Sequence, residues 1–236
     1  MRDTRLTGVV SMAALAGSSG AGARFEGGAG VPSTRSGRHD GKEHTVRKAG
    51  GDGETLEALH ARLMTARRGE PVEDILARIL ASWASGKGCL PRWLGLGETE
   101  FQRMVAYHFP GLGTRRLEGA ETSLELERGE ELDDLRVLLL ENRSGRTASE
   151  VWMAEIVITG CMGSDHLWQD LGLWSRAELS RLMEENFAPL AMRNDRDMKW
   201  KKFLYKQLCE AEGVYVCRSP SCEVCVDYHN CFGTED

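Results

Sequence analysis

The chain has 236 residues, of which 41% are hydrophobic and 28% charged, so it can bury one sizeable core. Its formal net charge is −6, and residues 1–50 hold eight Lys or Arg against four Asp or Glu, which leaves 22 against 32 for the remainder. This acidity argues against a general nucleic-acid-binding protein, and no apolar stretch is long enough to span a membrane.

Residues 1–53 are rich in Gly, Ser, Ala and Arg, with Phe25 as their only aromatic residue. Such a segment cannot bury enough apolar surface to offset its ordering entropy, so we predict a disordered tail. An overlong start-site assignment would look the same. Arg2 and Arg5 precede a weakly apolar run, as in a signal peptide, but Gly8 and Ser11 interrupt it, and we expect a cytoplasmic protein.

Residues 54–236 are predicted to form an all-α domain. Apolar residues recur there at spacings of three and four, first at Leu56, Leu59 and Leu63, then at Ile75, Leu76, Ile79, Leu80 and Trp83. Three capping-box patterns predict helix starts: Thr99 with Gln102, Thr147 with Glu150, and Ser175 with Glu178. Strand-like alternation is confined to residues 123–128.

An internal similarity predicts a duplicated pair of helices. Residues 79–96 align without gaps on residues 156–173, an offset of 77 at which two Leu-Gly-Leu triplets coincide. With one residue inserted, the match extends from residues 101–109 to residues 179–187. Two stacked units sharing a core would explain this pattern, and chance similarity between amphipathic helical hairpins is the alternative.

A basic amphipathic helix is predicted over residues 198–211. Its apolar face holds Trp200, Phe203, Leu204 and Leu208, together with Gln207, and we expect this face to dock on the core. Lysines occupy the rest of the helix, at Lys199, Lys201, Lys202 and Lys206.

Four cysteines follow this helix: Cys217, Cys222, Cys225 and Cys231, with the spacing Cys-x4-Cys-x2-Cys-x5-Cys. The first three match the spacing that plant-type ferredoxins use for an iron–sulfur cluster, whereas structural zinc sites more often use two short pairs set well apart. Spacing alone leaves an iron–sulfur cluster, structural zinc and disulfides open. Because seven cysteines are an odd number and four crowd at one end, a reducing compartment and a metal are favoured over disulfides.

The stretch DMKWKKFLYKQLCEAEGVYVCRSPSCEVCVDYHNCFG, residues 197–233, resembles the NifQ family of nitrogen-fixation proteins. The resemblance includes GCMGSDHLWQDLGL at residues 160–173 and extends weakly back to about residue 55. It implies a non-enzymatic iron–sulfur protein, of the 4Fe-4S or Mo-Fe-S type, with the four cysteines as cluster ligands. It also implies that molybdate or sulfur-bound molybdenum is accepted and passed to the assembly of the nitrogenase iron–molybdenum cofactor. The partners would be the cofactor-assembly scaffold and the nitrogenase iron protein.

Several further residues are candidates for auxiliary roles in that chemistry. Cys161 and His166, in GCMGSDH, could form a transient molybdenum-entry site, although a packed thiol and a hydrogen-bonded imidazole are the plainer interpretation. The duplication places Cys89 opposite His166. His229 could supplement the four thiolates, and Cys209 is expected to be a packed or spare thiol.

The lysines of residues 199–206, with Arg193, Arg196 and Arg218, would attract a negatively charged cluster and molybdate. An ordinary solvated helix face is the alternative, and docking of an acidic partner is a third use of the same charges.

Hydrolase and nucleotide-binding motifs are absent. A structural zinc-binding interaction module and a redox protein with a stable cluster therefore remain the competing functions.

Overall fold

The computed structural model describes residues 54–112, 117, 119, 129–211, 213, 228–233 and 235. The chain divides into two units, Met1–Val46 and Arg47–Asp236, and all described residues belong to the second. The predicted tail of residues 1–53 and the alternating segment of residues 123–128 lie outside the described residues.

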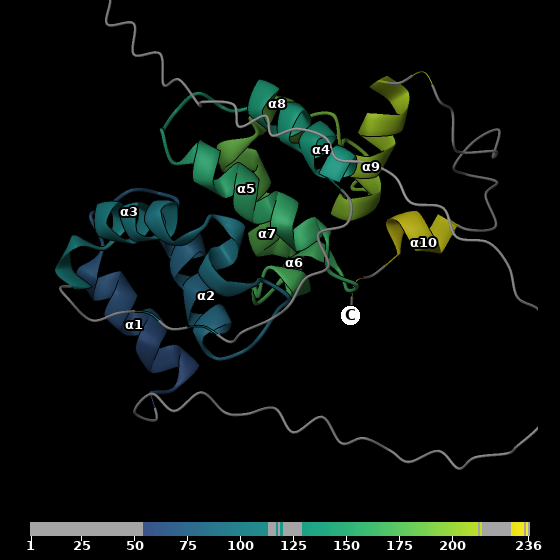
Figure 1. The fold of residues 1–236 in the computed structure, drawn as a ribbon. Coiled ribbons are helices and arrows are strands. Elements are labelled where there is room, and N and C mark those ends of the chain that lie inside the picture. Colours follow the sequence, from purple (N-terminus) through teal and green to yellow (C-terminus); the bar gives the residue numbers. More distant parts are fainter. Residues whose placement is uncertain are drawn as a thin grey trace, which may run out of the picture. The chain divides into compact units, whose positions relative to one another are not determined.

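The described part of the chain is entirely helical, which confirms the predicted all-α class (Figure 1). Its α-helices are α1 (Leu56–Ala66), α2 (Glu73–Ala84), α3 (Glu98–His108), α4 (Gly129–Glu141), α5 (Glu150–Cys161), α6 (Leu167–Asp170), α7 (Arg176–Asn186), α8 (Ala188–Ala191), α9 (Trp200–Ala211) and α10 (Tyr228–Phe232). Two short 3-10 helices, η1 (Arg92–Gly95) and η2 (Pro110–Leu112), flank α3.

Helices α2 and α5 form the centre of the core, because apolar residues surround most of their circumference. Helix α1 packs on α2, α4 packs on α5, and α9 packs on α4. The fully buried side chains at the centre include Ile75, Leu76, Ile79, Leu80, Met153, Ile156 and Val157. A helix that is apolar on most sides is stable only when other helices cover it, so these two helices fix the arrangement of the rest.

The predicted helix starts are correct in one case of three. Ser175 caps α7, with its hydroxyl accepting a hydrogen bond from the Glu178 amide at 3.3 Å. The Thr99 prediction is wrong, because α3 begins at Glu98 behind Gly97, whose φ of +77° makes the turn without a side-chain cap. The Thr147 prediction is wrong about the start, because the chain enters α5 through Ser149, but the predicted contact is present, since the Thr147 amide donates to the Glu150 carboxylate at 3.1 Å.

Buried carboxylates organise the entries to α2 and α5. Glu150, 1% exposed, accepts hydrogen bonds from the amides of Gly145, Arg146 and Thr147 at 2.8, 2.7 and 3.1 Å. Glu73, 77 residues earlier and fully buried, accepts from the amides of Gly69 and Glu70. Each carboxylate thereby pairs with backbone donors of the turn ahead of its helix.

Two glycines of the Leu-Gly-Leu triplets pack against these central helices. A Cβ on Gly95 would collide with the side chain of Thr159 on α5, and a Cβ on Gly172 would lie 2.7 Å from the Cβ of Ser82 on α2. Both glycines have positive φ, +82° and +71°. Gly95 and Gly172 are 77 residues apart, and so are their contact partners Ser82 and Thr159, which is the offset of the predicted internal similarity. Duplication itself stays a hypothesis about the origin of this arrangement.

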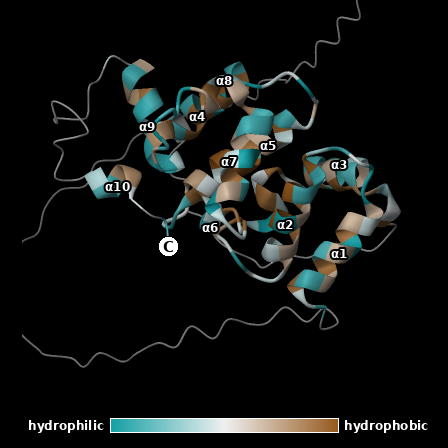
Figure 2. Ribbon diagram, turned by 180° about the vertical axis from the view of Figure 1, so that it is seen from behind, coloured by the Kyte–Doolittle hydropathy of each residue, from teal (hydrophilic) through white to brown (hydrophobic). Residues whose placement is uncertain are grey.

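Helix α9 begins at Trp200, two residues after the predicted start of the basic helix. Trp200, Phe203 and Leu204 are buried, and the Trp200 indole donates to the Ser180 hydroxyl of α7 at 3.2 Å. Figure 2 shows hydrophilic and hydrophobic residues in alternation along α9, as expected of a helix with one buried face. The apolar face therefore holds the basic side chains of α9 at a defined place on the surface.

Replacing Glu150 by Ala is expected to lower the free energy of unfolding by about 2–4 kcal/mol, because three backbone amides lose a charged acceptor in a buried position. Glu184→Ala, on the exposed face of α7, should change it by less than about 0.5 kcal/mol. Urea unfolding followed by circular dichroism measures both, and equal midpoints would contradict the capping role.

Candidate metal and oxyanion site

The structure describes one of the four predicted cluster ligands. Cys231 lies in α10, is partly buried and packs against the core. Cys217, Cys222 and Cys225 lie outside the described residues, so the geometry of the four thiols together stays a prediction. Within the described ranges, no group of three or more His, Cys, Asp or Glu side chains could hold a metal ion.

Helix α10 is attached to the residue that precedes α9. The Lys199 amide donates to the carbonyl of Cys231 at 2.7 Å, and the Lys199 ammonium donates to the carbonyl of His229 at 3.1 Å. Within α10, the rings of Tyr228 and Phe232 stack with centroids 4.7 Å apart. The His229 side chain is exposed. These contacts place the last cysteine of the block beside the start of the basic helix.

Lys201 enters the interior instead of facing solvent. Its ammonium donates to the carbonyls of Gly163 and Asp165, both at 2.8 Å, and forms an ion pair with the carboxylate of Asp170. The Asp170 side chain is 3% exposed and that of Lys201 17%. Because an ammonium has three N–H donors, this lysine is fully engaged, so the solvated-face interpretation is wrong for it.

Cys161 and Cys89 lie near this ion pair as neutral thiols. Burial raises the pKa of the Cys161 thiol to about 12. Burial, followed by the charge and the hydrogen bond of Asp170, raises the pKa of the Cys89 thiol to about 12. Metal ions bind thiolates, so neither side chain is a ready ligand at neutral pH. This geometry favours the plainer interpretation of Cys161 as a packed thiol.

His166 precedes α6 and is held near the end of the chain. Its amide donates to the Gln169 side chain at 3.2 Å, and its Nδ1 lies 3.8 Å from a carboxylate oxygen of Glu235. The other oxygen of Glu235 lies 3.4 Å from Nε of Arg176, which also binds the Asp197 carboxylate through two hydrogen bonds of 2.7 Å. Asp197, in the left-handed region at φ +55°, turns the chain toward α9.

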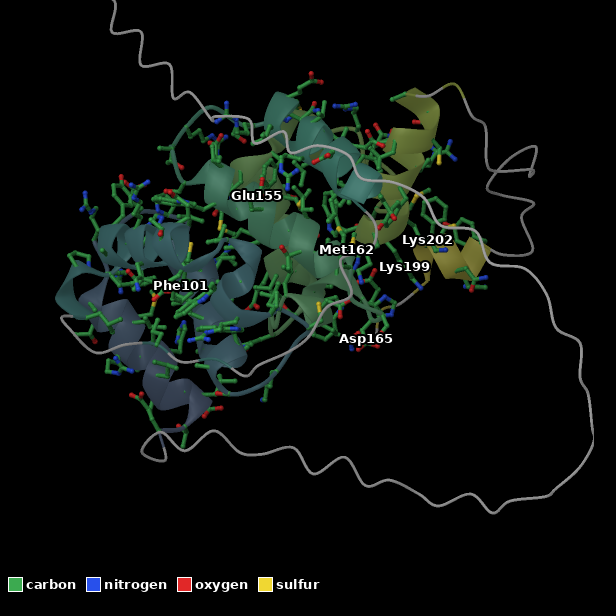
Figure 3. All side chains as sticks on the ribbon, in the orientation of Figure 1. Phe101, Glu155, Met162, Asp165, Lys199 and Lys202 are labelled. Atoms are coloured by element: carbon green, nitrogen blue, oxygen red, sulfur yellow. The ribbon has the colours of Figure 1, made fainter. Side chains whose placement is uncertain are left out.

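The α6 entry, the start of α9 and α10 surround a hollow of about 350 Å³, which we call the lysine hollow. It is lined by Ser164, Asp165, His166, Leu167, Lys199, Lys201, Lys202, Asn230 and Glu235. Figure 3 shows Lys199 and Lys202 beside α10, with Asp165 on the facing turn. Of the predicted auxiliary residues, His166 lines this hollow, whereas Cys161 and His229 do not. Sequence reasoning did not single out Ser164, Asp170 or Glu235, and no spacing pattern marks them.

A larger hollow, of about 410 Å³, lies at α1 and η2, away from α10 (Figure 1). Its lining is Arg62, Thr65, Ala66, Gly111 and Leu112. With one charged side chain, which already pairs with Glu54 at 2.8 Å, it offers less chemistry than the lysine hollow despite its size.

Comparison with known proteins assigns the family. The family model NifQ matches residues 75–233. The chain is 49% identical to Protein NifQ of Azotobacter vinelandii over 170 residues, 68% of this chain and 87% of that protein. It is 35% identical to Protein NifQ of Klebsiella pneumoniae over 177 residues, 69% of this chain and 99% of that protein.

The fold thus defines a helical protein with a basic helix, α9, and the sequence adds a C-terminal cysteine block. The chain belongs to the NifQ family, as the sequence resemblance predicted. No solved structure matches it significantly. Among the described helices, none is both long and apolar enough to cross a membrane.

Replacing Lys201 by Met is expected to lower the free energy of unfolding by about 2–4 kcal/mol, because the buried Asp170 carboxylate loses its cationic partner. Lys206→Met removes a lysine of the same helix whose exposed pair with Glu210 spans 3.2 Å, and should cost at most about 0.5 kcal/mol. Thermal unfolding of both variants measures the difference, and a Lys201 variant as stable as the control would refute the role of the pair.

Cys89 and Cys161 are expected to react with iodoacetamide at pH 8 at least about a hundredfold more slowly in the folded protein than in urea. The reason is that pKa values of about 12 leave little thiolate at that pH, and thiolate is the reacting form. Raising the pH toward 12 should speed both reactions. Mass spectrometry of the cysteine peptides measures each rate, and equal rates in folded and unfolded protein would contradict the burial of these thiols.

Proposed function

We infer that this chain is a carrier that binds an iron–sulfur cluster through Cys217, Cys222, Cys225 and Cys231, accepts molybdenum and donates it to cofactor assembly. Membership of the NifQ family implies a role in nitrogen fixation and in biosynthesis of the iron–molybdenum cofactor. The observation that carries the finer proposal is the extent of the family match. It reaches residue 233 and so includes every cysteine of the block.

The donor set suits iron and molybdenum in sulfur-bound form. Four thiolates are soft ligands of the kind that hold iron–sulfur clusters. Cys231 is held by the 2.7 Å hydrogen bond from the Lys199 amide to its carbonyl, which gives the block one fixed end. Such a cluster, when bound, would supply sulfide as a ligand for molybdenum.

The basic residues support the same proposal electrostatically. A cluster on four thiolates carries net negative charge, and molybdate is a dianion. The ammonium groups of Lys199 and Lys202 lie at the lysine hollow beside α10, where they would favour the approach of both. The protein then needs to bind, orient and release its cargo, and we propose no catalytic residue.

The proposed recipients are the cofactor-assembly scaffold and the nitrogenase iron protein. Cys231, the described member of the block, lies in α10 outside the helices α2 and α5 that form the core, so a partner could approach it without disturbance of that core. Reduced thiols suit a cytoplasmic location, which stays a prediction. A structural zinc module remains the second candidate, because Cys222 and Cys225 form one short Cys-x2-Cys pair.

Replacing Cys222 or Cys225 by Ala is expected to remove the metal centre and abolish molybdenum donation, because a cluster ligand is lost. The helical content should stay unchanged, because the buried apolar residues of α2 and α5 form the core of the described helices. Iron, molybdenum and zinc per chain are measured in anaerobically purified protein from cells supplied with molybdate.

Cys209→Ala is the matched control, since it removes a thiol of α9 outside the block. About four irons with up to one molybdenum in the wild type and the control, and neither in the block variants, would support the carrier. One zinc alone would assign the block to a structural role, and iron without molybdenum would favour redox chemistry. Unchanged metal content in the block variants would refute the ligand assignment.

A further inference from the structure

The start of α9 is electrostatically unfavourable in the absence of an anion. Lys199 directly precedes the helix, and Lys201 and Lys202 occupy its first turn, which contains no acidic residue. The N-terminus of a helix carries partial positive charge, so cations there destabilise it and anions stabilise it. Asp170 compensates the charge of Lys201. In the described ranges, no carboxylate pairs with the ammonium of Lys199 or Lys202.

The carboxylates at the lysine hollow do not cancel this charge. The Glu235 side chain is 3% exposed and lies against Arg176 and His166. Asp165 is exposed, and its carbonyl is taken by Lys201. Asp170 pairs with Lys201, and Arg176 pairs with Glu235. The remaining charged groups are Lys199, Lys202 and Asp165, so the hollow has a net positive charge.

The hollow also offers neutral hydrogen-bonding groups, and its walls are held in place by backbone contacts. Ser164 and Asn230 line it, with a hydroxyl and an amide as hydrogen-bonding groups. The contacts of Lys201 to Gly163 and Asp165 hold the turn that forms one wall, and those of Lys199 to Cys231 and His229 hold the other. A volume of about 350 Å³ accommodates a small ion with some of its water.

We propose that the lysine hollow binds a tetrahedral oxyanion, held chiefly by the ammonium groups of Lys199 and Lys202. This inference rests on the proposed function in one respect, because the carrier's cargo makes molybdate the relevant ion. The site differs from the cysteine block: it captures the oxyanion by charge and hydrogen bonds, before any bond to sulfur. Its position beside Cys231 delivers the ion to the end of that block.

The test is equilibrium dialysis of full-length protein with molybdate, read as bound molybdenum, in low salt and under anaerobic conditions. The double variant Lys199→Gln with Lys202→Gln is expected to bind molybdate at least about tenfold more weakly, because hydrogen bonds from charged donors are lost. Iron content should be unchanged, since no cysteine is altered. The matched control, Lys87→Gln with Lys206→Gln, removes the same charge from exposed positions outside the hollow and should keep wild-type affinity.

A Cys222→Ala variant separates this proposal from the carrier function. If it loses iron but retains molybdate affinity, the oxyanion site is independent of the cysteine block, as proposed. If it loses molybdate while the lysine double variant retains it, the hollow is not the site, although the carrier function stands. An equal loss in the control double variant would show a general effect of charge and overturn the proposal.

Competing ions identify the ligand. Tungstate and sulfate, which are tetrahedral dianions like molybdate, should displace it, whereas chloride at the same ionic strength should displace it at least about tenfold less. Equal displacement by chloride would show non-specific attraction of anions and overturn the proposal. Unchanged molybdate binding in the lysine double variant, with weakened binding of an acidic partner protein, would reassign the lysines to docking.

Discussion

The ion pair between Lys201 and Asp170 connects the parts of the chain on which the site depends. It joins the first turn of α9 to the end of α6, and the same ammonium holds the carbonyls of Gly163 and Asp165. The carbonyl of Asp170 accepts the amide of Cys89, which adds the segment after α2. A buried ion pair is maintained only when its remaining donors and acceptors are satisfied, and here the surrounding backbone satisfies them. The direction of α9, and with it the positions of Lys199 and Lys202, follows from this contact.

Small residues make the contact possible. A Cβ on Gly163 would collide with the Asp170 carboxylate and lie 2.6 Å from the Cys89 sulfur, and a Cβ on Gly88 would lie 2.7 Å from the Asp170 carbonyl oxygen. Gly95 and Gly172 allow the same kind of close contact with Thr159 of α5 and Ser82 of α2. The turns between helices therefore approach one another at backbone distance. The Asp170 side chain is accordingly only 3% exposed.

Sequence periodicity was sufficient for the all-α class, because burial on one helix face repeats every three to four residues. Ser175 was found because capping is a local interaction, whereas the entry to α5 depends on Glu150 reaching three amides of a preceding turn. The partner of Lys201 is 31 residues away and has no periodic relation to it, so the helix pattern could only suggest a solvated lysine. The cysteine spacing and the family resemblance predicted a cluster chemistry, but the lysine hollow required the tertiary structure.

The fold gives Cys89 and Cys161 an environment that keeps their thiols neutral. Burial and the Asp170 carboxylate keep Cys89 and Cys161 protonated, so these thiols compete poorly for metal although they lie close to the turn that lines the lysine hollow. An oxyanion attracted to Lys199 and Lys202 would therefore meet neutral sulfur on the core side and the end of the cysteine block on the other. In the proposed function, the high pKa of the Cys89 and Cys161 thiols leaves molybdenum to the terminal block. The same carboxylate that positions the basic helix thus keeps the neighbouring thiols from capturing the cargo.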